Sequence, residues 1–376
     1  MMIFLDSASG TKPYPEVIDI ITDVLTNHWG NASSAHAMGD DARQIINNAA
    51  QIVAADLNCD EDEIIWTSGA TESNNLAILG VDPQDLITTR LEHSSIFSLM
   101  ANEPYKYNYR FIQNDNKGFI DLDSLQRIID ISKELKQHFL VSVCFGNSEI
   151  GTIQDIKIIS KIVHDNKGLL HVDATQVLPE MSIDVKKYGI DLLSASGQKL
   201  GCCKGVGILY VRKGINLRPL IHGTQQNFVR GGTYPTHLIA AFGKALEITR
   251  EHNASEYIGA LRNKFLNKLL QIDGVTLNGT YLPDARLKNN ISITIDGVNA
   301  EQLTTLCSLQ DIYISKGSAC NSYNPTPSKT LLSIGLTAEQ AFNTIRLTLN
   351  EYNTEEEINI ASDIIAKLVE RIREND

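Results

Sequence analysis

The feature that most constrains the fold is a repeated alternation of short apolar runs with longer segments of helical period. Predominantly apolar runs of strand length indicate strands that are buried on both faces of a sheet. Their alternation with helical segments favours βαβ units and therefore a mainly parallel sheet. The predicted strands cover residues 63–67, 85–89, 139–145, 169–173, 191–196 and 207–211, and the predicted helices cover 71–80, 94–102, 121–136 and 155–166.

The pattern changes near residue 235. A helical stretch, with Pro235 suited to its first turn, extends to about residue 271. After it come shorter elements of both kinds, which are typical of an α+β unit. The predicted strands here cover 289–296, 312–315 and 344–349, and the predicted helices lie near 299–309 and from about 354 onward.

We therefore expect an α/β fold of two domains, because 376 residues are too many for one simple core. The larger domain would span residues 15–250 and contain a mainly parallel central sheet flanked by helices. The smaller α+β domain would combine residues 1–14 with residues 251–376, so that both ends of the chain contribute to it.

Composition and charge argue against several classes of partner. The formal net charge is −12, so we expect neither direct nucleic-acid binding nor attraction to an acidic membrane surface. No apolar run approaches the roughly 20 residues that span a bilayer, and the start MMIFLDSASG lacks the basic region of a secretory signal. The six cysteines form no C-x-x-C pair, which favours reduced thiols in the cytoplasm and predicts no metal site.

Chemically useful side chains follow the ends of five predicted strands. Open α/β sheets bind ligands at the carboxyl ends of their strands, so we expect these side chains to share one edge. The first end is TSGATESNN (67–75), where Ala70 and Thr71 would open a helix and offer free backbone N–H groups to a phosphate. An ordinary Thr N-cap explains the same residues, and taken alone it is the commoner explanation.

Three more strand ends carry groups that can ionise. His93 could stack on a ring or transfer protons, although a helix-start His bonded to the backbone is the commoner case. Asp173, at the tip of a buried strand, needs a cationic partner or a helix N-terminus. Lys199 follows its strand by three residues and would alone be a solvated loop lysine. The fifth end, residues 142–151, adds polar side chains to the same space.

Together these groups match the requirements of pyridoxal phosphate. This cofactor needs a lysine for its Schiff base, an acid that holds the proton of its pyridinium nitrogen, and an anion site for its phosphate. A further reactive group is predicted in the second domain. Cys320 lies in SKGSACNSYNP (315–325), a loop rich in Gly, Ser and Asn, where a thiol is exposed rather than buried.

The order and spacing of these segments resemble the cysteine desulfurase family, the NifS- and IscS-like enzymes among the class V aminotransferases, which have fold-type I and use pyridoxal phosphate. The resemblance runs from about Phe4 to Thr348 and includes NASSAHAMG (31–39), which is similar to the N-P-S-S-x-H-x-x-G segment of that family. The other matching segments are TSGATESNNLAI, EHSSI, SEIGTIQDI, HVDATQ, SGQKLGCCKGVGILYV, RGGTYPTH, KGSAC and PSKTLLSIGLTAEQAFNTIRLTL.

The resemblance implies a role for each group near the cofactor. Lys199 matches the Schiff-base lysine, and Asp173 matches the acid that pairs with the pyridinium nitrogen. Gln176 matches the residue that bonds the phenolic oxygen, and His93 matches the histidine that stacks on the ring and moves protons. The residues that match the phosphate site are Ala70, Thr71, Ser196, Gln198 and, reaching from a neighbouring subunit, Thr233. A homodimer is therefore implied.

The resemblance also implies a substrate and an activity. Arg346 matches the guanidinium that holds the carboxylate of L-cysteine, and Asn31 is a further substrate contact. Cys320 matches the nucleophile that takes the sulfur as a persulfide. The implied reaction converts L-cysteine to L-alanine and passes the sulfur to a protein acceptor, either an iron–sulfur cluster scaffold or a protein of tRNA or nucleic-acid thiolation.

Several positions depart from the family pattern. Gln198 stands where the family has His, so it can donate a hydrogen bond but carries no positive charge. Ser148 stands where the family has an Asn that contacts cofactor and substrate, so Asn147 or a water would have to compensate. Cys202 and Cys203 replace a Gly-Pro pair. Two alternatives stay open: a selenocysteine lyase or related C–S lyase, and a low-activity, scaffold-like member that binds partners without robust turnover.

Overall fold

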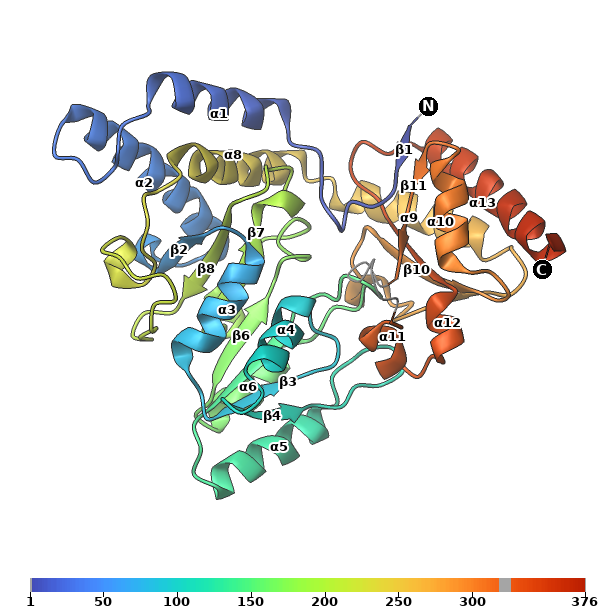
Figure 1. The fold of residues 1–376 in the computed structure, drawn as a ribbon, viewed down its shortest axis with the longest axis horizontal. Coiled ribbons are helices and arrows are strands. Elements are labelled where there is room, and N and C mark those ends of the chain that lie inside the picture. The colour runs from blue at the N-terminus through green and yellow to red at the C-terminus, as the bar shows by residue number, and fades with distance from the viewer. Residues whose placement is uncertain (1, 318–325, 376) are drawn as a thin grey trace.

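A mainly parallel sheet of seven strands forms the centre of the larger domain (Figure 1). The computed structural model describes residues 2–317 and 326–375 of the chain. Each strand of this sheet is parallel to the others except β8, which runs antiparallel between β2 and β7. In spatial order the strands are β2 (Ile64–Thr67), β8 (Gly207–Val211), β7 (Leu192–Ser196), β6 (Leu169–Asp173), β5 (Phe139–Cys144), β3 (Asp85–Thr88) and β4 (Asn108–Phe111).

Helices cover both faces of this sheet, as the alternation of its side chains requires. Ile64 and Trp66 belong to a core that also contains residues of α2, α5, α6 and α8, whereas Ile65 belongs to a core with α3 and α4. The helices of this domain are α1 (Pro15–Asn27), α2 (Ala37–Leu57), α3 (Ala70–Val81), α4 (Ser94–Asn102), α5 (Leu122–Glu134), α6 (Ile156–Asp165), α7 (Val185–Tyr188) and α8 (Thr236–His252).

The smaller domain draws on both ends of the chain (Figure 1). Its antiparallel sheet has the order β12 (Ser315–Lys316), β13 (Thr344–Thr348), β10 (Asn290–Ile295) and β9 (Val275–Leu277), while β1 (Ile3–Phe4) pairs with β11 (Ile312–Tyr313). A separate hydrophobic core is formed by Ile3, Leu5 and residues between 261 and 372, and it contains no residue of the central sheet. The helices here are α9 (Ser255–Leu269), α10 (Ala300–Ser308), α11 (Lys329–Ser333), α12 (Ala338–Phe342) and α13 (Glu355–Asn375).

The predicted fold class is confirmed, but some elements differ from the prediction. The stretch predicted as one helical region from 235 to 271 is two helices, because Asn253 takes a left-handed conformation with φ 44° and ends α8. The run 312–315 is two short strands that pair with different partners. Helices α1 and α2 were not predicted, and half of the buried residues of α2 are alanine. Those small residues let α2 approach α8 closely, near Gly243.

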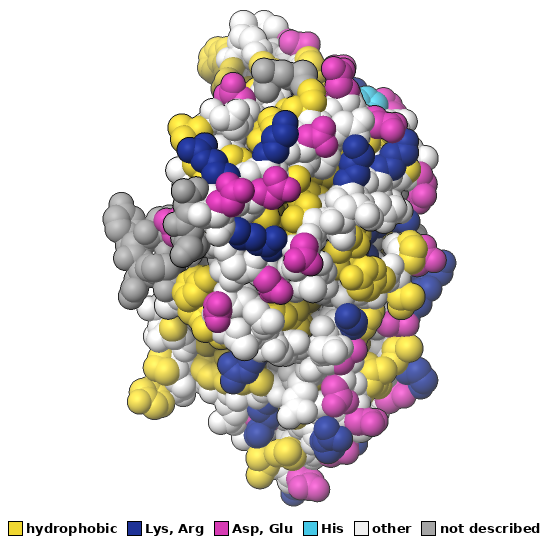
Figure 2. All heavy atoms as spheres, turned by 90° about the vertical axis from the view of Figure 1, so that its right-hand side faces the viewer, with side chains coloured by type: hydrophobic (Ala, Val, Ile, Leu, Met, Phe, Trp, Pro, Cys, Tyr) yellow, Lys and Arg dark blue, Asp and Glu magenta, His cyan; other side chains and the backbone are white. Residues whose placement is uncertain are grey.

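Charged side chains of both signs are interspersed on the face of the molecule in Figure 2, which carries the smaller domain. No broad field of one sign is visible on that face. Within residues 2–317 and 326–375, no helix combines the length and the apolar character needed to cross a bilayer.

Candidate active site

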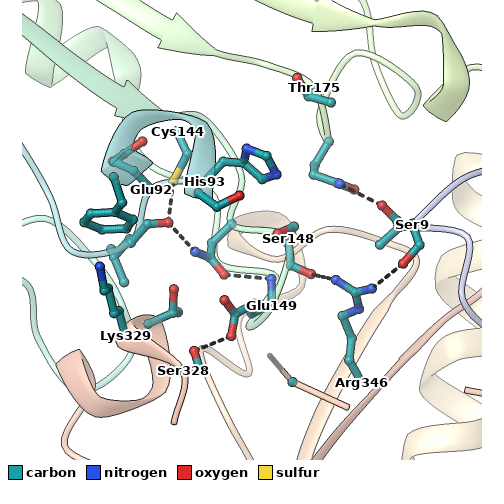
Figure 3. A pocket seen from close by; sticks show the side chains of 18 of the residues that line it. Ser9, Glu92, His93, Cys144, Ser148, Glu149, Thr175, Ser328, Lys329 and Arg346 are labelled. Atoms are coloured by element: carbon teal, nitrogen blue, oxygen red, sulfur yellow. Dashed lines mark hydrogen bonds between the residues drawn. The ribbon is translucent and has the colours of Figure 1, made fainter. Parts of the chain in front are cut away.

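A cavity of about 850 Å³ lies where the carboxyl ends of the central strands face the smaller domain (Figure 3). The large domain contributes residues that follow β2, β3, β5, β6 and β7, as the sequence analysis expected for an open α/β sheet. The smaller domain contributes residues from β12, α10, α11, α12 and β13. Predicted site residues that line the cavity are Ala70, Thr71, His93, Ser148, Asp173, Gln176, Ser196, Gln198, Lys199 and Arg346.

Lys199 is presented to the cavity by a short turn after β7. The buried run Leu192–Ser196 ends at the sheet edge, and the 3₁₀ turn Gly197–Lys199 follows at once. The carbonyl of Gln198 accepts from the backbone N–H of Thr11 at 3.0 Å, which anchors this turn to the N-terminal segment. The pKa of Lys199 is lowered to about 8, mainly by burial and secondly by the positive charge of Arg346. A neutral, nucleophilic amine is therefore accessible near neutral pH.

Asp173 is the last residue of β6 and is buried at the floor of the cavity. Its Oδ2 accepts from the side-chain amide of Asn74 at 2.8 Å, and its Oδ1 accepts from the backbone N–H of Thr175 at 3.0 Å. Asn74 also donates to Ser95 Oγ at 3.0 Å, so α3 and α4 both help to orient it. Its partnership with Asp173 was not predicted, because the sequence indicates only a polar residue in the first turns of a helix.

His93 caps the N-terminus of α4, which is the explanation that the sequence analysis gave as the commoner one. Its Nδ1 accepts from the backbone N–H of Ser95 at 3.1 Å. In the neutral ring this bond leaves the proton on Nε2. The ring nevertheless lines the cavity (Figure 3), so the cap and a role in the site are compatible.

Glu92, beside His93, is a site residue that the sequence analysis did not assign. It is only 5% exposed, and its Oε1 accepts from Thr89 Oγ1 at 2.6 Å. Its Oε2 has no hydrogen-bond partner among the described residues. Its pKa is raised to about 8, mainly by burial and in part by the negative charge of Asp173, against the opposing effect of the hydrogen bond from Thr89. Glu92 therefore holds a proton at neutral pH.

The start of α3 provides an anion site. Gly69 has φ +152°, and the first backbone N–H groups of α3 have no partners within the helix. A Cβ added at Gly69 would lie 3.7 Å from Ser196 Oγ, so the absence of a side chain keeps the space between them open. Glu72, in the first turn of α3, forms an ion pair with Arg230 at 2.8 Å, so its negative charge is compensated.

Arg346 enters the cavity from β13 of the smaller domain and is 4% exposed. One Nη donates to Ser9 Oγ at 2.9 Å, and the other donates to the carbonyl of Ser148 at 3.2 Å (Figure 3). The Nη that bonds Ser9 also donates to Asp6 Oδ1 at 2.8 Å. Its Nε has no partner among the described residues. The guanidinium is thus held in place with part of its hydrogen-bonding capacity unused.

Asn147 does not compensate for Ser148, contrary to one possibility raised from the sequence. Its Nδ2 donates to the carbonyl of Leu91 at 2.7 Å, and its Oδ1 accepts from the backbone N–H groups of Glu149 and Ile150. All of its polar atoms are therefore engaged in shaping the turn after β5. Ser148 lines the cavity with a shorter side chain than Asn would have.

The remaining predicted residues lie elsewhere. Gln176 Nε2 donates to the carbonyl of Ala8 at 3.2 Å at the edge of the cavity. Thr233 and Asn31 are exposed and do not line the cavity of their own chain, and Asn31 Oδ1 accepts from the N–H of Ser33. Cys320 lies outside the described residues, but Gly317 and Thr326 on either side of it line the cavity, so its role stays a prediction.

The model of the aminotransferase class-V family matches residues 3–360. The chain belongs to this family. Cysteine desulfurase IscS of Dictyoglomus turgidum is 35% identical to this chain, and the similarity covers 99% of this chain and 95% of the relative. Cysteine desulfurase IscS 1 of Archaeoglobus fulgidus is 36% identical, and the similarity covers 99% of this chain and 98% of the relative. A solved structure of a NifS-like protein is 30% identical and has a TM-score of 0.91, with 99% of this chain and 100% of that chain covered. The predicted family is confirmed.

Enzymes of this family depend on pyridoxal phosphate, and the residues of this cavity fit that cofactor. Lys199 supplies an amine with a lowered pKa, Asp173 supplies a buried acid for the pyridinium nitrogen, and the start of α3 supplies an anion site. Thr175 Oγ1 is buried and lacks a partner among the described residues, so the cavity still has an unsatisfied polar atom. In the described part of the chain, no group of three or more His, Cys, Asp or Glu side chains could hold a metal ion.

Proposed function

We propose that this chain is a pyridoxal-phosphate-dependent cysteine desulfurase, which converts L-cysteine to L-alanine and keeps the sulfur as a persulfide on Cys320. The observation that carries the proposal is the convergence of Lys199, Asp173 and Arg346 on one cavity, in a chain similar over its whole length to cysteine desulfurases. An amine, a buried acid and a buried guanidinium are what an amino-acid substrate and this cofactor require together.

Each residue of the site has a separate role in the proposed reaction. Bound pyridoxal phosphate draws electrons away from the α-carbon of the substrate. Arg346 binds the substrate carboxylate, aided by its unused Nε, while Asp6 and Ser9 keep its plane fixed. Lys199, neutral above its lowered pKa, takes the α-proton, and the Nε2 proton of His93 is available to the substrate sulfur or the ring. Attack of the Cys320 thiolate on the substrate sulfur then breaks the C–S bond.

We also infer a homodimer. Thr233 is exposed and lies outside the cavity of its own chain, which agrees with a contact to the phosphate site of a second copy. The segment before it exposes Leu220, Ile221 and, at 66% exposure, Phe228. Large apolar side chains gathered along one exposed segment favour burial against another protein surface.

The sulfur acceptor is proposed to be a protein, an iron–sulfur cluster scaffold or a thiolation protein, and the location to be the cytoplasm. Reduced thiols support the location, because the described cysteines Cys59, Cys144, Cys202, Cys203 and Cys307 are all free.

One experiment tests the proposed activity directly. The native protein, loaded with pyridoxal phosphate, should release alanine from cysteine in the presence of a thiol reductant. Lys199→Ala should lose both the visible absorbance of the lysine-bound cofactor and the turnover. Cys320→Ala should keep that absorbance and form no persulfide. Absence of alanine from a fully loaded native protein would contradict the proposal, and faster turnover of selenocysteine than of cysteine would favour the lyase alternative.

A further inference from the structure

Two adjacent cysteines follow the catalytic lysine but take no part in the site described above. Cys202 and Cys203 lie three and four residues after Lys199, and neither lines the cavity. Their Sγ atoms are 3.7 Å apart, within reach of a thiol hydrogen bond. Cys202 is 1% exposed and packs in the core of the large domain, whereas Cys203 is partly exposed. The pair thus joins a buried thiol to an accessible one.

The two thiols differ in acidity because of their contact. The hydrogen bond from Cys202 stabilises the thiolate of Cys203 and lowers its pKa to about 7, despite the opposing effect of burial. The same contact, together with burial, raises the pKa of Cys202 far above its usual range. At neutral pH the accessible member is therefore a nucleophile, and the buried member retains its proton.

A bond between the neighbouring sulfurs would require a local change in the backbone conformation around the pair. Neighbouring Cα atoms are about 3.8 Å apart, which is less than the usual span of a disulfide, so such a bond is strained and readily reduced. Glycines with positive φ flank the pair, Gly201 at +72° and Gly205 at +93°. Gly201 is held by hydrogen bonds to Thr11 Oγ1 and from the N–H of Tyr14. Any change in backbone conformation would therefore occur between Gly201 and Gly205.

We propose that Cys202 and Cys203 form a thiol–disulfide exchange site that takes small organic disulfides. The Cys203 thiolate attacks one sulfur of the disulfide, breaks its S–S bond and releases one thiolate. Once Cys203 is bound in the mixed disulfide, it carries no negative charge and no longer holds the proton on Cys202. The Cys202 thiol then transfers its proton to the released thiolate and attacks Cys203 Sγ, which expels the second thiolate. The pair is oxidised to a vicinal disulfide, and the small disulfide is reduced to two thiols. This step does not depend on the proposed desulfurase activity.

The experiment uses oxidised glutathione as the small disulfide and the cofactor-loaded protein in its native state. After incubation, free thiols are alkylated in acid and the protein is digested with trypsin. Cleavage after Lys199 and Lys204 releases residues 200–204, which contain both members of the pair and no other cysteine. We expect this peptide without alkyl label and lighter than its reduced form by two hydrogen atoms, and we expect two labels after treatment with dithiothreitol.

Two matched variants assign the order of the steps. Cys202→Ser leaves no resolving thiol, so its peptide should carry one glutathione on Cys203. Cys203→Ser removes the accessible thiolate, so its peptide should carry only an alkyl label on Cys202. Retention of the visible absorbance of the bound cofactor shows that each variant is folded. A native peptide with two alkyl labels would overturn the proposal, as would a native peptide that stops at the glutathione adduct or glutathione on Cys202 of Cys203→Ser.

Discussion

The side-chain amide of Asn74 donates to the carboxylate of Asp173 at 2.8 Å, across a separation of 99 residues in the sequence. A neutral donor orients this carboxylate without cancelling its charge, which leaves the charge available to a pyridinium nitrogen. The same amide is fixed by Ser95, so the start of α4 and the body of α3 are both coupled to the acid on β6. Asn74 is therefore a positioning residue for the cofactor.

Removal of this hydrogen bond should weaken cofactor binding. Asn74→Ala is expected to reduce the affinity of the cofactor-free protein for pyridoxal phosphate by about tenfold or more, since hydrogen bonds to charged groups contribute about 1.5–3 kcal/mol. Asn102→Ala, an exposed Asn on the neighbouring helix, serves as the control and should leave the affinity unchanged. Affinities are read from absorbance titrations, and equal values for the two variants would show that Asn74 has only a structural role.

The lowered pKa of Lys199 predicts how cofactor loading depends on pH. Only the neutral amine attacks an aldehyde, so the loading rate should rise about tenfold per pH unit below the pKa of about 8 and level off above it. The positive charge of Lys204 is one cause of the lowered value, so Lys204→Ala should move the midpoint to higher pH. Stopped-flow absorbance from about pH 6 to about pH 9 measures both. A rate that is flat over this range, or one that still rises tenfold per pH unit at its upper end, would contradict a pKa of about 8 for Lys199.

The sequence predicted the central sheet and the gathering of its strand ends because buried parallel strands leave a strong periodic signal. The edge strands β4 and β9 leave a weaker signal, because they are only partly buried, whereas the edge strand β2 is buried throughout and was predicted. Lys199, Asp173 and His93 could be found because they lie at the ends of strands or within a few residues of them. Asn74 and Glu92 could not, because their roles depend on partners or burial that only the folded chain creates. The pairing of Asp6 with Arg346 spans 340 residues and has no local signature.

The short side chain at position 148 should limit substrate binding. Asn147 is fully engaged by Leu91, Glu149 and Ile150, so it cannot reach a substrate. Ser148→Asn restores the residue typical of the family and is expected to lower the KM for cysteine by about two- to tenfold, the effect of one added hydrogen bond. Ser148→Ala removes only the hydroxyl group and should therefore change the KM less. A KM that rises in Ser148→Asn would mean that the cavity is shaped around serine.

Glu92 should make the stability of the cofactor-free protein depend on pH. Its pKa is about 8 in the folded state against an ordinary value of 4.5, so the folded state binds more protons than the unfolded state between these values. The free energy of unfolding must therefore fall as pH rises through this window.

Glu92→Gln keeps the shape of the protonated acid and cannot ionise, so its thermal midpoint should exceed that of the native protein by an amount that grows from about pH 5 to about pH 8. Glu134→Gln, at an exposed carboxylate, is the control. A difference between Glu92→Gln and the native protein that stays constant with pH would show that Glu92 is already ionised at the lower value.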